Sequence, residues 1–235
     1  MNNLSGILSV MSGADLVAVA LLFAAWLGIG WFIEHSPEAR PSVSKLMKSY
    51  RHEWMRQFIT RQPRIFDSAI LASLREGTTF FASACMIAIG GGLALLGNLD
   101  RLRGVAEGFE VGQAPVILWQ IKIVVLLVLV TNAFLKFVWS HRLFGYCAIM
   151  MASVPNDPGD PHAVPRAAQA AEINITAARS FNAGMRSVYF AIGALGWLAG
   201  PWVLIGTTAL VLWVTWRREF ASHSRAVMLR GLPPS

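Results

Sequence analysis

The chain has 235 residues, of which 55% are hydrophobic and only 14% are charged. Charged residues make up about 25% of an ordinary soluble domain, so this composition indicates a membrane protein. The net charge is +7, but the basic residues are unevenly placed, as in membrane topology signals, and we expect no nucleic-acid partner. A chain of this length suits one helical membrane domain covering residues 1–235.

The first apolar segment covers residues 16–33. Residues 1–15 contain no Lys or Arg, whereas a secretory signal has a basic region before its apolar part. We therefore predict a retained first span. Further apolar segments lie at about 77–97, 116–138 and 187–216, and each is about as long as the 20 residues that cross a bilayer core. The pattern predicts an all-α, multi-pass membrane bundle with about four transmembrane segments.

Residues 42–62 have an amphipathic helical pattern, with apolar residues at three- and four-residue steps and basic residues on the other faces. Such a cytoplasmic helix lies on an anionic leaflet, packs on the protein's own surface, or does both at once. The predicted membrane-surface residues are Lys45, Lys48, Arg51, Trp54, Arg56 and Phe58. Residues 64–76 are predicted to lead helically into the second span.

The third span is predicted to continue to about Met151, followed by a proline-rich loop at 154–165 and an alanine-rich helix at 166–186. That helix feeds the segment 187–216, which Gly200-Pro201 interrupts near its middle. Two full spans do not fit in about 30 residues. We therefore expect either one long, kinked span, which is the preferred prediction, or a re-entrant hairpin that returns the chain.

Basic residues favour the cytoplasmic side of a membrane. They are abundant in 35–75 and 136–186 but sparse in the loop 98–115. The N-terminus is therefore predicted to lie outside a bacterial-type inner membrane. A basic tail containing Arg217 and Arg218 disagrees with four simple spans, so the side of the C-terminus stays open.

Polar residues occur on three of the predicted helical segments. In the predicted topology, all three groups lie at the cytoplasmic end of the bundle. They predict either a polar pocket, able to bind an anion or a lipid headgroup through Arg75 and Arg186, or a set of interhelical hydrogen bonds, which is the preferred interpretation. The candidate residues are Arg75, Glu76, Thr79, Ser83, Asn132, Lys136, Asn182, Arg186 and Tyr189.

Lys122 is the deepest charge in the predicted spans. An ionisable residue inside a bilayer is costly and is a candidate for function. Lys122 is close to Pro115, so one interpretation is that its side chain snorkels outward or makes a structural contact. The other interpretation is that it lines a substrate or ion path.

The sequence contains no motif of a known catalytic or cofactor site. None of its histidines lies deep in a predicted span, as a transmembrane haem would need, and no zinc or nucleotide-binding spacing occurs. We expect no metal and no cofactor, and the lack of a catalytic motif favours a non-enzymatic protein over an enzyme.

Several stretches together resemble a family of integral membrane proteins catalogued as domain of unknown function 599. The resemblance covers about 16–225. It rests on Arg51-His52-Glu53-Trp54, DSAILASL from Asp67, TTFFAS from Thr78, KFVWS from Lys136, FNAGMRSVYF from Phe181, GWLAGPW from Gly196 and WRREF from Trp216. It implies a four-span helical protein. It implies no particular activity, because none is established for the family. It directs attention to Arg75, Thr79, Ser83, Asn182, Arg186 and Tyr189.

The leading functional hypothesis is a non-enzymatic membrane protein that acts by assembly, as a homo-oligomer or an accessory subunit of a larger complex. The alternative is a small transporter or channel for an ion or small anion, and the third hypothesis is a lipid-binding or lipid-modifying protein. The expected partners are the bilayer, anionic lipids and membrane protein subunits.

Overall fold

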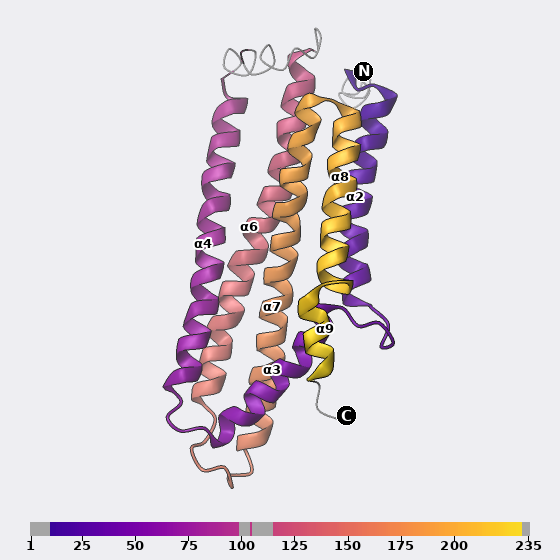
Figure 1. The fold of residues 1–235 in the computed structure, drawn as a ribbon. Helices are drawn as coiled ribbons and strands as arrows, with labels where there is room; N and C mark the ends of the chain where they lie inside the picture. Colours follow the sequence, from indigo (N-terminus) through magenta and orange to yellow (C-terminus); the bar gives the residue numbers. More distant parts are fainter. Residues whose placement is uncertain (1–9, 99–103, 105–114, 232–235) are drawn as a thin grey trace. The chain divides into compact units, whose positions relative to one another are not determined.

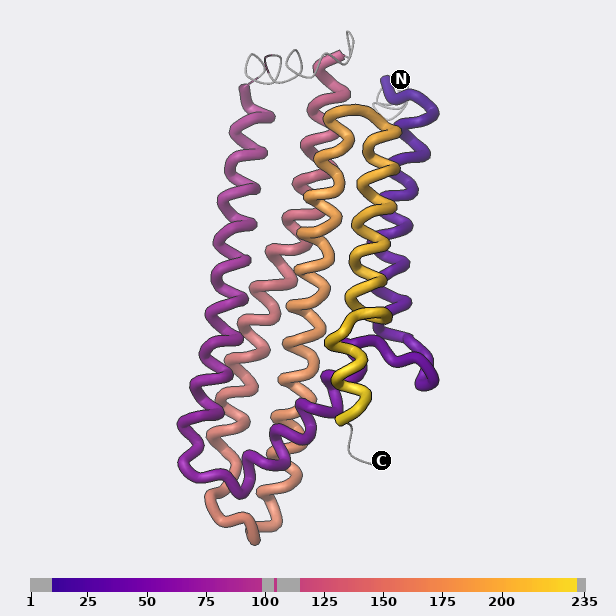
Figure 2. The backbone as a smooth tube through the Cα atoms, in the orientation of Figure 1, coloured from indigo at the N-terminus to yellow at the C-terminus, as the bar shows by residue number. Residues whose placement is uncertain are grey.

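The computed structural model describes residues 10–98, 104 and 115–231, and no strand occurs among them (Figures 1 and 2). The all-α prediction is confirmed. The expected outer loop at 98–115 falls almost wholly outside the described residues. The helices are α2 (Gly13–Glu34), α3 (Val43–Thr60), α4 (Ile65–Leu96), α6 (Val116–Ala152), α7 (Ala163–Ala194), the 3-10 helix η1 (Leu195–Ala199), α8 (Pro201–Phe220) and α9 (His223–Arg230).

Three helices, α2, α4 and α6, are long and apolar enough to cross a membrane. They contain the first three predicted spans, apart from the last residue of 77–97. The helical lead-in to the second span is present because α4 already begins at Ile65, and α6 continues past the predicted span to Ala152. Both helices are therefore longer than the apolar stretch needed to cross a bilayer core.

The fourth predicted segment is not one kinked span, and that preference was wrong. Helix α7 ends at Ala194, and α8 begins at Pro201 after the turn of η1. Gly200 has φ of 122°, a conformation that favours glycine, and proline is well suited to the first position of a helix. The Thr207 hydroxyl donates to the Gly193 carbonyl at 2.7 Å. The chain therefore forms a helical hairpin in which α8 returns alongside the end of α7.

The chain divides into two compact units, which are described separately. Unit 1 contains 1–31, 84–133 and 185–216, and unit 2 contains 32–83, 134–184 and 217–235.

Polar side chains join three helices in unit 1. The Trp26 indole donates to the Ser187 hydroxyl, and this hydroxyl donates to Asn132 Oδ1, both at 3.1 Å. Interhelical hydrogen bonds of this kind were the preferred interpretation for Asn132, and they link α2, α7 and α6.

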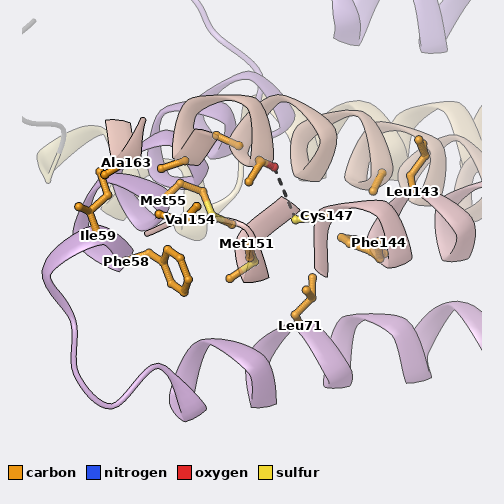
Figure 3. Packing of buried hydrophobic residues seen from close by; sticks show 14 residues of the cluster. Met55, Phe58, Ile59, Leu71, Leu143, Phe144, Cys147, Met151, Val154 and Ala163 are labelled. Atoms are coloured by element: carbon orange, nitrogen blue, oxygen red, sulfur yellow. Dashed lines mark hydrogen bonds between the residues drawn. The ribbon is translucent and has the colours of Figure 1, made fainter. Parts of the chain in front are cut away.

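The core of unit 2 joins α3, α4, α6 and α7 (Figure 3). Met55, Phe58 and Ile59 of α3 are buried against Met151 and its neighbours on α6. Alanines of α7 complete the cluster: Ala163, Ala167, Ala170, Ala171 and Ala177. Their small side chains allow close helix packing.

The helix predicted at 42–62 is present as α3, which begins after the Ser42 N-cap. Of its two expected environments, the structure shows packing on the protein itself: Phe58 is buried, Trp54 donates to Asp67 at 2.7 Å, and Arg51 donates to Asn174. The Lys45 ammonium donates to the Ser36 carbonyl at 3.1 Å. Contact of Lys48 and the rest of α3 with a leaflet stays a prediction.

Gly184 provides a test of the packing in unit 2. A Cβ atom at Gly184 would lie 2.8 Å from Phe137 Cε1, and Phe137 is itself enclosed by the rings of Phe81 and Phe181, with centroids at 5.4 and 5.5 Å. Because this ring has no room to move, we expect Gly184→Ala to destabilise the protein by about 1–3 kcal/mol. Thermal unfolding in one detergent would measure this.

The matched control is Gly145→Ala on α6, where a Cβ atom meets nothing within 4 Å. This change should be neutral or stabilising, because alanine is the better helix former. Equal melting temperatures for the two variants would contradict the packing shown for Gly184.

Candidate functional site

Unit 2 contains a cavity of about 430 Å³, here called the arginine pocket. Its polar side chains are Arg64, Ser68, Arg75 and Asn156, and its walls are otherwise apolar. The pocket is formed by the end of α3, the first turns of α4, the end of α6 and the loop that follows. Ser68, Leu71, Ala72 and Arg75 recur at three- and four-residue steps, which places them on one face of α4.

Arg64 closes one side of the pocket. Its guanidinium donates to the carbonyls of Val154 at 2.8 Å, Pro155 at 2.7 Å and Ile59 at 3.2 Å. The same group lies over the Phe58 ring, 4.5 Å from the centroid. These contacts attach the predicted proline-rich loop to α3. They leave the charge of Arg64 without an ion pair to any described carboxylate.

Arg75 has even fewer partners. Its Nε atom is buried and has no hydrogen-bond partner among the described residues, and its side chain forms no ion pair there. A buried donor without a partner costs about 1–3 kcal/mol, and more if it is charged. Two guanidinium groups without a carboxylate, facing one partly apolar cavity, make this pocket suited to an anion.

Helix α4 continues from Arg75 into a small polar cluster. The hydroxyls of Thr78 and Thr79 donate to the Arg75 carbonyl at 2.6 and 3.2 Å. They lie 3.1 and 3.3 Å from His141 Nδ1. Nδ1 donates to these hydroxyls in one ring tautomer and accepts from them in the other.

Sequence reasoning included Thr79 in the candidate site and missed Thr78 and His141. His141 lies on α6, and no local pattern in the sequence indicates which residue of α4 it faces.

Of the residues predicted for the polar pocket, Arg75 lines the arginine pocket, and the other arginine in that lining is Arg64. The pocket predicted around Arg75 and Arg186 stays a prediction. In unit 2, Glu76, Ser83 and Lys136 are exposed, while Asn182 donates to the Ser44 hydroxyl at 3.5 Å. Ser44 in turn donates to Glu219 through its backbone N–H and its hydroxyl, both at 3.0 Å.

The remaining predicted residues belong to unit 1. Arg186 is 8% exposed, and its guanidinium packs beside Gly30 on α2, where a Cβ atom would lie 3.6 Å from Nε. Tyr189 is partly buried. Lys122 is buried, with its ammonium 4.6 Å from the Trp119 ring centroid and 5.8 Å from that of Trp197.

Two further charged contacts stabilise the part of unit 2 around α3. Arg51 is partly buried and donates to Asn174, and burial lowers the pKa of its guanidinium from the ordinary value. Arg51 nevertheless stays charged. At the surface, the hydrogen bond from Arg56 lowers the pKa of the Glu53 carboxyl.

The described residues contain no group of three or more His, Cys, Asp or Glu side chains that could hold a metal ion. Both cysteines, Cys85 and Cys147, are buried and unpaired as disulfides. Cys147 lies in the core of unit 2, where its thiol donates to the Ala170 carbonyl at 3.5 Å (Figure 3).

Asp67 has a structural role beside the pocket. Its carboxylate is fully buried, and Oδ1 accepts hydrogen bonds from the Trp54 indole at 2.7 Å and from Arg61. We expect Asp67→Ala to destabilise the protein by about 1–3 kcal/mol, because it leaves the Trp54 indole and the partly exposed Arg61 guanidinium without their acceptor. Chemical or thermal unfolding in detergent would measure this loss.

The exposed pair of Glu53 and Arg56 on α3, joined at 2.6 Å, is the matched comparison. Glu53→Ala should change stability little, because solvent screens a surface ion pair. If both alanine variants unfolded at the wild-type temperature, the role given to Asp67 would be wrong.

These observations define the class as an all-α protein with three helices able to cross a membrane by length and composition. A family model described as "Protein of unknown function, DUF599" matches residues 17–224. The chain therefore belongs to this family, as the resemblance predicted. No curated protein and no solved structure matches it.

Proposed function

We propose that the protein is a non-enzymatic integral membrane protein that binds the phosphate of an anionic lipid in the arginine pocket. The observation that carries this proposal is the buried Nε of Arg75, which has no hydrogen-bond partner among the described residues. It corresponds to the lipid-binding hypothesis from the sequence, with Arg64 in place of Arg186.

The chemistry of the pocket supports a phosphate with an attached apolar chain. Guanidinium groups bind phosphate oxygens through directed, charge-assisted hydrogen bonds. Arg64 is already held in place by three carbonyls, so little side-chain freedom is lost when an anion binds. Leu71 and Met151 offer an apolar wall for the first part of an acyl chain.

The membrane topology is part of this proposal: an inner-membrane protein with its N-terminus outside and unit 2 at the cytoplasmic side. Unit 2 contains the basic segment 35–75, the basic segment 136–186 except for its last two residues, and the tail from Arg217. In that tail, Arg225 Nε donates to the Pro41 carbonyl at 2.9 Å, and Met228 accepts from Tyr50 at 3.1 Å. This grouping supports a cytoplasmic C-terminus, because all the basic segments then share one side.

Lipid binding can be tested at Arg75. We expect Arg75→Met to weaken binding of phosphatidylglycerol about tenfold, the loss of one charge-assisted hydrogen-bonding group. The measurement is the shift in melting temperature when phosphatidylglycerol is added to protein in a neutral detergent. Phosphatidylcholine and inorganic phosphate form the comparison series and separate a lipid from a free anion.

The matched control is Arg142→Met on α6, since Arg142 is exposed and donates to Tyr146 on its own helix at 2.8 Å. This variant should keep the wild-type response to phosphatidylglycerol. Equal responses of wild type and Arg75→Met would exclude the arginine pocket as the lipid site.

Assembly, as a homo-oligomer or an accessory subunit, is a second candidate with its own support. Only 6% of the apolar window of α4 is buried, against 22% for α2 and 28% for α6. One exposed face of α4 contains the large residues Phe80 and Ile87 and the small residues Ser83, Gly90 and Ala94. Small residues on a membrane helix allow another helix to approach closely.

Gly90 tests this second candidate. A Cβ atom there meets nothing within 4 Å, so Gly90→Leu should leave the fold of one chain intact. If α4 packs against another chain, the added side chain separates the helices, and we expect a smaller particle mass in mild detergent. Mass photometry or light scattering would measure it.

Gly28→Leu on α2 is the control, because Gly28 is also exposed and open. Assembly through α4 would be ruled out by an unchanged mass for Gly90→Leu.

A further inference from the structure

Unit 1 contains a second cavity, of about 230 Å³, and Lys122 is the only charged residue among the described residues that line it. We call it the lysine cavity. Lys122 is 6% exposed and comes from α6. The facing wall of α4 includes Ala88 and Gly91, and the end of α7 and η1 contribute Ala194 and Leu198. A mostly apolar hollow with one placed polar group is the usual form of a small-molecule site.

The ammonium of Lys122 has no conventional partner. It forms no hydrogen bond and no ion pair with any described residue, and its contacts are the faces of Trp119 at 4.6 Å and Trp197 at 5.8 Å. Cation–π contacts satisfy part of the charge, but they leave the three N–H donors of the ammonium unused.

Asp15 carries the opposite charge and interacts with Lys122 electrostatically, but its oxygens are already engaged. Oδ1 accepts from the Trp197 indole at 2.7 Å. Oδ2 accepts from the Ser12 hydroxyl at 2.6 Å and the Ser12 backbone N–H at 3.1 Å. Asp15 thus attaches the start of α2 to η1 and fixes the Trp197 ring that lies beside Lys122.

The geometry points to a binding site for a carboxylate with an apolar body, in which Lys122 takes the charge and the cavity takes the body. A bound anion accepts the hydrogen bonds of the Lys122 ammonium, which Asp15 does not accept. Among the described residues, the walls supply no charged group other than Lys122, which repels a cation and attracts an anion. This inference does not depend on the arginine pocket, which belongs to unit 2.

The test is fluorescence quenching by brominated carboxylic acids, because bromine quenches indole fluorescence at short range and Trp119 and Trp197 flank the lysine. Protein carrying Arg75→Met, which disables the arginine pocket, is placed in phosphatidylcholine nanodiscs. It is titrated with a medium-chain acid, a long-chain acid and the methyl ester of each. We expect saturable quenching by an acid and about tenfold weaker binding of its uncharged ester.

Two variants, each added to that Arg75→Met protein, locate the effect. Lys122→Met should weaken binding of the acid about tenfold, to the level of the ester. Gly91→Leu keeps the lysine but fills the cavity, since a Cβ atom at Gly91 meets nothing within 4 Å and Gly91 lines the wall. It should abolish saturable quenching. In nanodiscs that each hold one chain, where assembly through α4 has no part, Gly90→Leu at the neighbouring open position outside the cavity lining should leave binding unchanged.

Binding of the medium-chain acid alone identifies a small soluble acid, and binding of the long-chain acid identifies a membrane fatty acid. Either result supports the site. Quenching that never saturates, an ester that binds as tightly as its acid, or equal titrations for Gly90→Leu and Gly91→Leu would overturn it. The glycine pair decides the question even if Lys122→Met fails to fold.

Discussion

The reversal of the chain at Gly200-Pro201 is the constraint on which the rest of the structure depends. It converts a long apolar stretch into the end of α7 and the start of α8, and the Thr207 hydroxyl holds the two together at the Gly193 carbonyl. Without the left-handed backbone of Gly200, α8 would continue away from α7. The tail from Arg217 would then not belong to the same unit as α3.

The two cavities share one physical feature, a cation that lacks a carboxylate partner among the described residues. Burial of an unpaired charge is costly, and a folded chain usually pairs it, as Asp67 pairs with Arg61 in unit 2. Arg75 and Lys122 differ from that pattern. The contrast within one molecule is the reason for treating both cations as binding groups and Asp67 as structural.

The sequence predicted several elements well because their signals are local. Apolar length alone indicated α2, α4 and α6, and the amphipathic pattern with its flanking prolines indicated α3 nearly to the residue. The candidate site depends on contacts between helices, and the predicted polar pocket stays a prediction. Arg75, one of its residues, lines a cavity with Arg64, which in the sequence is only one of many basic residues of the segment 35–75. His141 was missed because its contact with Thr78 joins residues of two different helices.

The sequence by itself determined the all-α class, the family and the approximate positions of α2, α3, α4 and α6, since hydropathy, proline and capping residues act over one or two turns. Only the tertiary structure decided which faces of the helices meet. A helix turns its side chains through 100° per residue, so a small change in rotation or register changes every neighbour. Three features could therefore be seen only in the folded chain. They are the hairpin at Gly200, the cavity that Arg64 and Arg75 both line, and the position of Lys122 beside two tryptophans.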